Sequence, residues 1–564
     1  MEALDWLVIG VFFLALIGII VWVVRQKQND SADYFLGGRD ATWLAIGASI
    51  FASNIGSEHL IGLAGAGASS GMAMAHWEIQ GWMILILGWV FVPFYTRSMV
   101  YTMPEFLERR YNPQSRTILS VISLVSYVLT KVAVTVYAGG LVFQQVFGIK
   151  ELWGIDFFWI AAIGLVVLTA LYTIFGGMKS VLYTSVLQTP ILLLGSLIIL
   201  VLGFKELGGW DEMMRVCGAV TVNDYGDTMT NLIRSNDDAN FPWLGALIGS
   251  AIIGFWYWCT DQFIVQRVLS GKNEMEARRG TIFGAYLKLL PVFLFLISGM
   301  IAFALHQKYI GAGGEGFLPM LANGTANADA AFPTLVAKLL PAGVKGLVVC
   351  GILAALMSSL ASLFNSSAML FTIDFYKRFK PETPEKKLVG IGQIATIVIV
   401  VLGILWIPIM RSVGDVLYTY LQDVQSVLAP GIAAAFLLGI CWKRTSAQGG
   451  MWGLISGMVI GLTRLGAKVY YSNAGEVADS TFKYLFYDMN WLFFCGWMFL
   501  FCIIVVIVVS LATEAPTAEK IQGLVFGTAT KEQKAATRAS WNHWDIIHTV
   551  IILAITAAFY WYFW

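Results

Sequence analysis

FASNIGSEHLIGLAGAGASSG, residues 51–71, is an apolar, glycine-rich stretch that is long enough to enter a membrane, yet polar side chains interrupt it. Asn54, Glu58 and His59 stand close together near its start. An ionisable side chain at bilayer depth costs roughly 2.5 to 3.5 kcal/mol on insertion scales, so such groups persist where they line a water-filled path or a binding site. The stretch therefore predicts a membrane helix that is broken at a functional site.

The composition predicts a polytopic membrane protein. The chain is 58% hydrophobic and only 13% charged, which leaves too little polar surface to cover a soluble core. About fourteen apolar runs reach spanning length, so the predicted fold class is an all-α membrane protein with about 14 transmembrane helices. The formal net charge of +1 gives no reason to expect a nucleic-acid partner. The 6 cysteines and 5 histidines are scattered, so no cofactor or transition-metal site is expected.

Lysine and arginine residues mark one side of the predicted bundle. With the N-terminus outside, the basic clusters fall on the inner side, as the positive-inside rule requires; they lie near residues 25–27, 97–110, 267–279, 377–387 and 443–444. An even number of spans returns the C-terminus to the outside as well. The first helix lacks a basic segment before it, so we expect it to be retained and not cleaved as a signal. The expected location is the plasma (inner) membrane.

A second apolar run, residues 242–266, also turns polar, at Thr260, Asp261 and Gln262. The two interrupted runs stand about five predicted helices apart, a pattern typical of transporters with two inverted repeats and a binding site at the unwound midpoints. Unwound backbone is tolerated in a bilayer only where it lines a cavity or is buried in protein. Close helix packing is the alternative explanation for the glycines, but it does not account for Asn54 or Glu58.

A third segment carries small polar residues at helical spacing. Ala355, Ser358 and Ser359 share one helix face because they are spaced i, i+3 and i+4. If the first broken helix unwinds at Ala52 and Ile55, three carbonyls and two hydroxyls would form an all-oxygen cage that suits a dehydrated alkali cation. Serine on a helix face more often serves helix packing, so the spacing alone leaves both interpretations open.

Five stretches in order and spacing resemble one family. They are residues 51–71, WYWCTDQFIVQR at 256–267, GAYLKLLP at 284–291, LMSSLASLFNSSAMLFTIDFY at 356–376 and YLQDVQSVLAPG at 420–431. Together they resemble the sodium/solute symporter family, in its sodium/glucose cotransporter branch. The resemblance implies a leucine-transporter-type core of two inverted five-helix repeats. The implied organisation is an extra N-terminal helix and cytoplasmic loop at 1–41, a first repeat at 42–204, an extracellular loop at 205–241, a second repeat at 242–441 and three peripheral helices at 442–564.

The resemblance also implies roles for individual residues. Sodium, as co-substrate, would be held by the five positions that the spacing selects, Ala52, Ile55, Ala355, Ser358 and Ser359. The sugar would meet Asn54, Glu58, His59, Glu78, Lys131, Tyr257, Trp258, Lys288 and Gln422. The gates would be Tyr257 on the inner side and Leu63, Trp77 and Tyr418 on the outer side. A polyol needs both donors and acceptors, which amide, carboxylate and ammonium groups supply. Glu78, Lys131 and Lys288 have a second interpretation, as charge pairs that neutralise one another inside the bundle.

Four positions depart from the family pattern. Ser185 stands where members with two sodium ions carry an aspartate, and Ala361 stands where a hydroxyl is expected. Both departures favour one sodium ion per sugar. Gly254 and Thr419 replace residues that touch the substrate in relatives, so the selectivity among hydroxyls stays open.

The resulting hypothesis is sodium-driven symport of a hexose such as glucose or galactose by alternating access. Proton coupling is disfavoured because the cation cage holds no titratable carboxylate. Another solute, such as myo-inositol, a sialic acid or a carboxylate, stays open; a carboxylate should be held by an unpaired arginine or a helix N-terminus, and no arginine is expected inside the core helices. A sugar sensor or channel-like protein that binds without accumulating solute also stays open. An enzyme is not expected, since no nucleophile and base stand at workable spacing. The expected partners are the sugar, sodium and the lipid bilayer, with the oligomeric state open.

Overall fold

The computed structural model describes residues 1–26, 30–56, 58–321, 324–413, 417–473 and 478–564. Within these ranges nearly all regular structure is helical, and a two-stranded antiparallel ladder joins β1 (Glu151–Leu152) to β2 (Ile155–Asp156). Ten helical segments of the described chain are long and apolar enough to cross a membrane. The predicted class, an all-α membrane protein, is confirmed at this level, while the count of fourteen spans and the inverted repeats stay predictions.

The first part of the chain alternates long helices with short 3-10 or π-helical turns, which carry η labels. These elements are α1 (Ala3–Arg25), α2 (Ser31–Leu36), η1 (Gly37–Arg39), α3 (Trp43–Asn54), η2 (Glu58–Leu63), α4 (Ala64–Ser70), η3 (Gly71–Met74), α5 (Ala75–Glu78), α6 (Gly81–Ile86), η4 (Leu87–Phe91), α7 (Val92–Ser98), α8 (Met103–Arg110), α9 (Pro113–Ser126), η5 (Tyr127–Val132), α10 (Ala133–Phe147), α11 (Phe157–Leu207) and α12 (Trp210–Gly218).

The second part repeats this alternation and ends in peripheral helices. Its elements are α13 (Trp243–Gly254), η6 (Phe255–Thr260), α14 (Gln262–Leu269), α15 (Glu274–Lys288), η7 (Val292–Leu296), α16 (Ile297–Gly311), η8 (Ala328–Ala330), α17 (Ala331–Leu339), α18 (Val344–Met369), η9 (Leu370–Tyr376), α19 (Lys377–Phe379), α20 (Glu385–Val413), α21 (Leu417–Cys441), α22 (Ala447–Asn473), α23 (Thr481–Lys483), η10 (Tyr484–Asp488), α24 (Trp491–Ala512), α25 (Ala518–Ile521), α26 (Lys531–Ala539) and α27 (His543–Tyr562).

Helix α11 is the clearest case of two spans joined end to end. Its 51 residues would extend about 76 Å at 1.5 Å per residue, more than twice the roughly 30 Å of a hydrocarbon core. Gly177 breaks it, with φ 51° and ψ −148°. A Cβ at Gly177 would collide with the backbone carbonyl of Tyr34 in α2, so both the left-handed φ and the close approach require glycine here.

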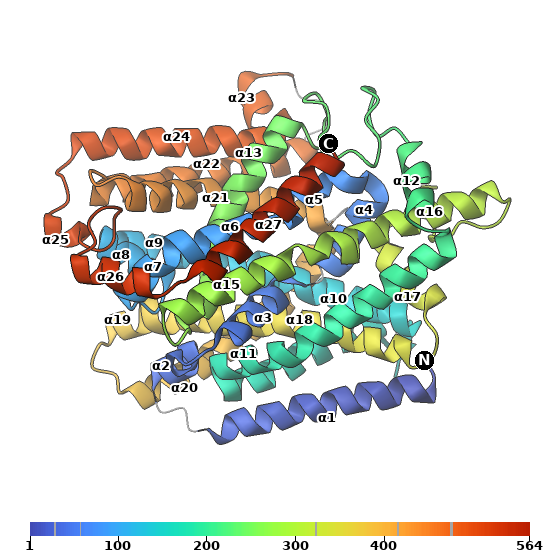
Figure 1. Cartoon of the computed structure of the whole chain (residues 1–564), viewed down its shortest axis with the longest axis horizontal. Helices are drawn as coiled ribbons and strands as arrows, with labels where there is room; N and C mark the ends of the chain where they lie inside the picture. The colour runs from blue at the N-terminus through green and yellow to red at the C-terminus, as the bar shows by residue number, and fades with distance from the viewer. Residues whose placement is uncertain (27–29, 57, 322–323, 414–416, 474–477) are drawn as a thin grey trace.

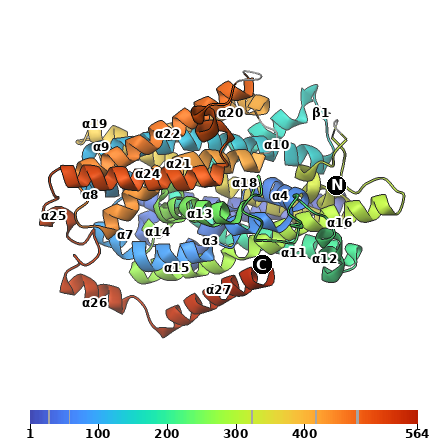
Figure 2. The same ribbon diagram turned by 90° about the horizontal axis from the view of Figure 1, so that it is seen from above.

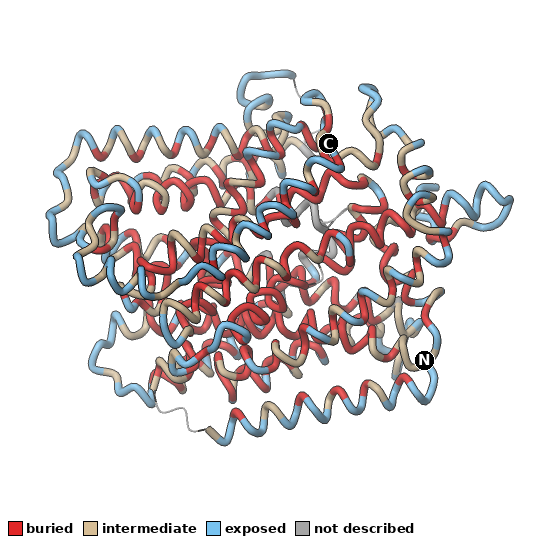
Figure 3. Tube along the Cα trace, in the orientation of Figure 1, coloured by how far each residue is buried: buried red, intermediate tan, exposed pale blue. Residues whose placement is uncertain are grey.

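Burial separates a central group of helices from peripheral ones. The apolar window of α18 and η9 is 89% buried, whereas the windows of α1 and of α27 are each 22% buried. Figure 1 places α1 along one edge of the bundle, Figure 2 shows α27 at its margin, and Figure 3 shows α1 largely exposed. Such peripheral helices present apolar side chains to their surroundings, as lipid-facing helices do. The helices that carry the predicted site, α3, α13 and α18, lie inside.

Candidate substrate and cation site

The first broken helix interrupts its hydrogen bonding where the sequence predicts a break. Helix α3 ends at Asn54, and Ile55 adopts extended backbone angles of φ −78° and ψ 108°. Helical structure resumes at Glu58 with the π-helical turn η2. Chain direction therefore changes between two buried helical segments, which frees backbone carbonyls of the last turn of α3 for other partners.

The second broken helix has the same plan. Helix α13 ends at Gly254, the π-helical turn η6 follows, and Asp261 adopts extended angles of φ −76° and ψ 128° before α14 begins. The Asp261 carboxylate caps α14 by accepting from the backbone N–H of Phe263. Short polar side chains at this position satisfy the free N–H groups of a helix start, which explains why the polar break occurs at this residue.

Two of the five predicted cation ligands, Ile55 and Ser359, meet between α3 and α18. The Ser359 hydroxyl lies within hydrogen-bonding distance of two carbonyls, that of Ser53 at 2.9 Å and that of Ile55 at 3.1 Å, and its single hydrogen is shared between them. Ser358 on the same helix lies with its Oγ 3.3 Å from the Oγ of Ser185 in α11. Ala52 and Ala355 are buried on the same two helices. The structure thus brings two carbonyls at the end of α3 against the Ser359 hydroxyl of α18, and such oxygen atoms suit an alkali cation.

A cavity of about 70 Å³ lies between the two helix breaks. All nine residues that the sequence assigned to the substrate line it: Asn54, Glu58, His59, Glu78, Lys131, Tyr257, Trp258, Lys288 and Gln422. Further lining residues are Trp77, Gln80, Thr135, Ile253, Gly254, Phe263, Ser359, Leu363 and Gln425. Ser359 therefore belongs to both the cavity wall and the cation cluster.

A continuous polar network lines the cavity. Lys288 Nζ lies 2.6 Å from Glu78 Oε2 and donates to Asn54 Oδ1 at 3.1 Å. Asn54 in turn donates from Nδ2 to the Tyr257 hydroxyl at 3.1 Å. His59 Nε2 lies 3.3 Å from Glu78 Oε2, although the contact is not aligned as a hydrogen bond. Glu78 and Lys288 thus form a charge pair and also line the cavity, so the pair faces any bound solute.

Lys131 forms a separate ion pair with Asp261 at the start of α14. Its ammonium lies 2.7 Å from Asp261 Oδ2, and the Tyr127 hydroxyl donates to the other oxygen of the same carboxylate. The ammonium also lies 4.7 Å from the ring centres of both Tyr257 and Phe263. Lys131 touches the cavity, but its charge is directed at the start of α14. Asp261 is a residue that the sequence analysis noted in the polar break without assigning it to the site.

The predicted gate residues occupy different positions. Tyr257 lies between the Asn54 contact and the Lys131 ammonium. Trp77 is buried and stacks on Trp491 of α24, with ring centres 5.5 Å apart and planes inclined by 26°. Leu63 is buried in η2 and is absent from the described residues that line the cavity. The side chain of Tyr418 lies outside those that the structure describes.

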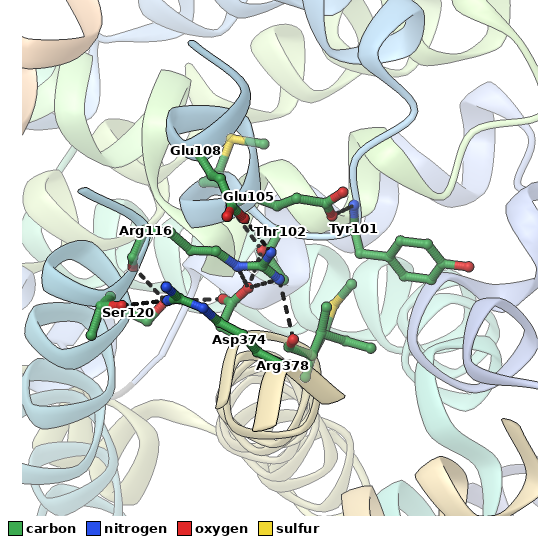
Figure 4. Close-up of polar contacts among 12 residues, drawn as sticks. Tyr101, Thr102, Glu105, Glu108, Arg116, Ser120, Asp374 and Arg378 are labelled. Atoms are coloured by element: carbon green, nitrogen blue, oxygen red, sulfur yellow. Dashed lines mark hydrogen bonds and ion pairs between the residues drawn. The ribbon is translucent and has the colours of Figure 1, made fainter. Parts of the chain in front are cut away.

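A polar cluster joins the start of α8 to α9 and η9 (Figure 4). Asp374 in η9 accepts hydrogen bonds from Thr102 Oγ1 at 2.8 Å and Arg116 Nε at 2.7 Å. Arg116 also bonds Glu108 at 2.6 Å. The Gln262 side chain, next to Asp261, accepts from the backbone N–H of Met103 at 2.8 Å. These contacts tie α8, α9, α14 and η9 together through residues that are not among the described residues lining the cavity.

One sequence-based expectation is wrong. Arg267 was grouped with the basic loop, and no arginine was expected inside the core helices. The structure buries Arg267 in α14 at 0% exposure, with its guanidinium 5.1 Å from the Phe263 ring. The last turn of α14 is enclosed by neighbouring helices, which a hydropathy pattern does not reveal. Arg267 is not among the described residues that line the cavity.

Comparison with known proteins identifies the family. The model of the "Sodium:solute symporter family" matches residues 34–457, which is most of the chain. The chain belongs to the sodium:solute symporter family. Its relatives include mouse sodium/myo-inositol cotransporter 2, 36% identical over 542 residues that cover 94% of this chain and 80% of that protein. Rabbit sodium/glucose cotransporter 1 is 37% identical over 534 residues, covering 91% of this chain and 79% of the relative.

A solved structure of a Na+-coupled sialic acid symporter shares the fold. The similarity has a TM-score of 0.72 at 22% identity, and it covers 92% of this chain and 99% of that one. Family membership and the apolar helices establish a multi-pass membrane protein that couples solute transport to sodium. The relatives transport different polyols by name, so the family alone does not decide the solute.

Sequence reasoning missed several residues of the site. Gln80, Phe263 and Gln425 line the cavity; Phe263 and Gln425 lie within the family-like stretches without a predicted role, and Gln80 lies outside those stretches. Gln80 follows Glu78 by two residues, and Phe263 follows Asp261 by two. For both Gln80 and Phe263, the sequence signal is a polar residue two positions earlier in an apolar run. Whether the neighbour points into the cavity depends on the turn geometry, which spacing alone does not give.

Proposed function

We propose that the protein drives the uptake of a neutral hexose or related cyclic polyol with the sodium gradient. The observation that carries this proposal is the position of Ser359, which lines the cavity while its hydroxyl lies against the Ser53 and Ile55 carbonyls at the end of α3. A cation bound there would fix α3 against α18 next to the cavity wall. Binding at one site then favours binding at the other, and by linkage the solute strengthens sodium binding by the same factor.

A neutral polyol is favoured over a carboxylate by the charges around the cavity. Lys288 is paired with Glu78 at 2.6 Å and Lys131 with Asp261 at 2.7 Å. Glu58 adds a further acid to the lining residues. Among the described lining residues there is no arginine, so no cation is left over to hold an anionic solute. Aromatic rings at Tyr257 and Trp258 offer apolar faces to a sugar ring.

A single sodium ion per solute is the proposed stoichiometry. Ser185 donates to the Val181 carbonyl at 2.6 Å and lies 3.3 Å from Ser358, so this position offers a hydroxyl and no carboxylate for a second cation. One ion is energetically sufficient. A tenfold sodium gradient supplies about 1.4 kcal/mol, and one charge crossing 100 mV supplies about 2.3 kcal/mol. Their sum supports accumulation of a neutral solute by several hundredfold, on the order of 500-fold.

The proposed topology has fourteen spans, with ten in two inverted repeats and both ends outside, in the plasma membrane. The long α11 with its break at Gly177 supports counting more spans than continuous helices. The two broken helices, each with a π-helical turn beside an extended residue, support the repeat. Rocking of one group of helices against another would then expose the site to each side in turn.

Ser359→Ala tests the coupling. The purified chain in proteoliposomes with an inward sodium gradient should accumulate labelled glucose, galactose or myo-inositol, and this variant should lose the sodium response. Ser362→Ala is the matched control, because Ser362 lies on the same helix and bonds Ser53 at 2.6 Å without belonging to the predicted ligands. Full sodium response in Ser359→Ala would show that the cation site is misplaced. Current or binding without accumulation would favour a sensor or channel-like protein.

A further inference from the structure

Gln80 lies against a glycine that has no room for a side chain. An ideal Cβ on Gly254 would lie 2.5 Å from Oε1, 2.9 Å from Cδ and 3.0 Å from Nε2 of Gln80. All three atoms of the amide group therefore lie within 3.0 Å of the position that a Cβ on residue 254 would take. Glycine weakens a helix interior relative to alanine, and here its absence of a side chain makes the space that the amide fills.

The orientation of the Gln80 amide is fixed by its partners. Its Nε2 donates to the Ser250 carbonyl at 2.8 Å, and its Oε1 accepts from the indole Nε1 of Trp258 at 3.3 Å. A carbonyl only accepts and an indole N–H only donates, so the amide cannot be reversed. Ser250, Gly254 and Trp258 are spaced by four residues, so the amide lies along one stripe of α13 and η6.

The same amide has hydrogen-bonding capacity to spare. A primary amide carries two N–H donors and two acceptor lone pairs, and the described contacts of Gln80 use one of each. Gln80 is 3% exposed and lines the cavity. A buried donor or acceptor without a partner is costly. The remaining N–H and lone pair are therefore suited to a group that both accepts and donates, as the hydroxyl of a sugar does.

Gln80 reaches the cavity from the turn that also delivers Glu78. Helix α5 ends at Glu78, and Gln80 has φ −87° and ψ 23° before α6 begins. The two side chains therefore enter one cavity from a single turn, with different chemistry. Glu78 is committed to Lys288 at 2.6 Å, whereas the amide is neutral and its described hydrogen bonds are to Ser250 of α13 and Trp258 of η6.

We propose that Gln80 determines substrate specificity by exchanging a donor and an acceptor with one hydroxyl of the solute, and that Gly254 is the space that admits its amide. This inference rests on the proposed polyol function and narrows it: the wall beside Trp258 recognises a hydroxyl, and a solute that lacks it there is rejected. Loss of a neutral hydrogen bond of this kind corresponds to about a three- to tenfold loss of affinity.

Binding of monodeoxy sugars tests the inference. The ligand-dependent shift in unfolding temperature of the purified full chain in sodium buffer would give affinities for glucose and for its 1-, 2-, 3-, 4- and 6-deoxy derivatives. In wild type, the analogue that lacks the hydroxyl facing Gln80 should bind about three- to tenfold more weakly than glucose. In Gln80→Leu this one analogue should bind as well as glucose. For each of the other analogues, the ratio of its affinity to that of glucose should stay as in wild type.

Gln393→Leu is the matched control, because Gln393 donates to the Ile174 carbonyl at 3.0 Å and lies away from the cavity; its ratios should equal those of wild type. If Gln80→Leu does not fold, the pair Gly254→Ala and Gln80→Ala/Gly254→Ala replaces it. Gly254→Ala alone should weaken glucose binding. The double variant should unfold at a higher temperature than Gly254→Ala, and it should bind glucose and the analogue without the hydroxyl facing Gln80 with equal affinity.

If the Gln80 variants lose the same affinity for glucose and for every analogue, the specificity role is overturned. A side chain that only supports the structure would change the affinities for all these ligands by the same factor. Wild type that binds glucose without sodium-driven accumulation would refute symport while leaving the analogue comparison decisive for Gln80. Wild type that binds neither glucose nor myo-inositol would overturn both.

Discussion

Neutralising Asp261 tests whether the ion pair beneath Tyr257 holds the inner side of the site closed. Asp261 begins α14, which runs toward the basic loop after residue 269, so the pair lies on that side of Tyr257. In Asp261→Asn the Lys131 ammonium, 2.7 Å from the carboxylate in wild type, becomes a buried charge without its counter-ion. Removing one partner of a buried pair costs roughly 3 to 5 kcal/mol.

The rings around the ammonium reduce this cost. The ammonium lies 4.7 Å from two ring centres, those of Tyr257 and Phe263, and each such contact contributes about 0.5 to 1 kcal/mol. We therefore expect Asp261→Asn to destabilise the state with a closed inner side by about 3 kcal/mol, near the lower limit. This corresponds to a change of about 150-fold in the equilibrium between the inward-closed and inward-open states. Apparent affinity for external solute falls with the fraction of molecules that remain competent to bind it.

The assay is the solute concentration dependence of sodium-driven uptake in proteoliposomes, together with the unfolding temperature of the purified protein. Asp261→Asn should raise the half-saturating solute concentration by one to two orders of magnitude, about 10- to 100-fold, and lower the unfolding temperature. Lys131→Met/Asp261→Asn removes both charges and should recover most of the loss, since a buried pair replaced by neutral groups is often tolerated.

Glu212→Gln is the control, because the Glu212–Arg215 pair of 2.6 Å lies on the surface and exposed pairs contribute little. The reasoning is refuted if Asp261→Asn behaves as wild type in both assays. It is also refuted if the stability and the solute affinity lost in the double variant equal the sum of the losses in Asp261→Asn and Lys131→Met measured separately.

Three further predictions concern the network, the cation site and the loop that contains η8. Glu78→Gln or Lys288→Met leaves the other member of the 2.6 Å pair as an unpaired buried charge, so each should lower uptake at least about tenfold and destabilise the protein by roughly 3 to 5 kcal/mol; wild-type uptake in either would remove the pair from the site. Ser185→Asp places a carboxylate beside Ser358, 3.3 Å away in wild type, so its unfolding temperature should rise more steeply with sodium than that of wild type, and an identical sodium response would contradict this placement. Burial raises the pKa of Asp329, in η8 between the spans, from 3.8 to about 6; the folded protein then holds a proton that the unfolded chain releases, and stability falls as pH rises through this window. The unfolding temperature of Asp329→Asn should therefore exceed that of wild type above pH 6, with the difference shrinking toward pH 4, and a difference that does not change with pH would contradict the burial of this carboxylate.

The sequence predicted the two helix breaks because a polar group in an apolar run has few physical explanations. Asn54 and Asp261 both stand at ends of helical segments in the structure. The facing of Ser359 toward the Ile55 carbonyl also followed from helical spacing once the break was assumed. These features depend on local periodicity, which a sequence displays directly.

Other features depend on distant partners and were not predictable in this way. The Lys131–Asp261 pair joins residues 130 apart in sequence, and the contact between Gln80 and Gly254 joins two helices whose relative rotation no spacing reveals. Burial of Arg267 depends on every helix around the end of α14. Periodicity identifies which face of a helix is buried, but the partner across that face is set by three-dimensional packing.

Simultaneous measurement of sodium and solute fluxes tests the central claim most directly. Proteoliposomes containing the wild-type chain, with an inward sodium gradient and labels on both sodium and glucose or myo-inositol, give the ratio of the two initial fluxes. The account predicts that each flux requires the other and that about one sodium ion enters per solute molecule, since the position beside Ser358 offers Ser185 and no carboxylate. Solute accumulation that is indifferent to sodium, or two sodium ions per solute, would contradict it.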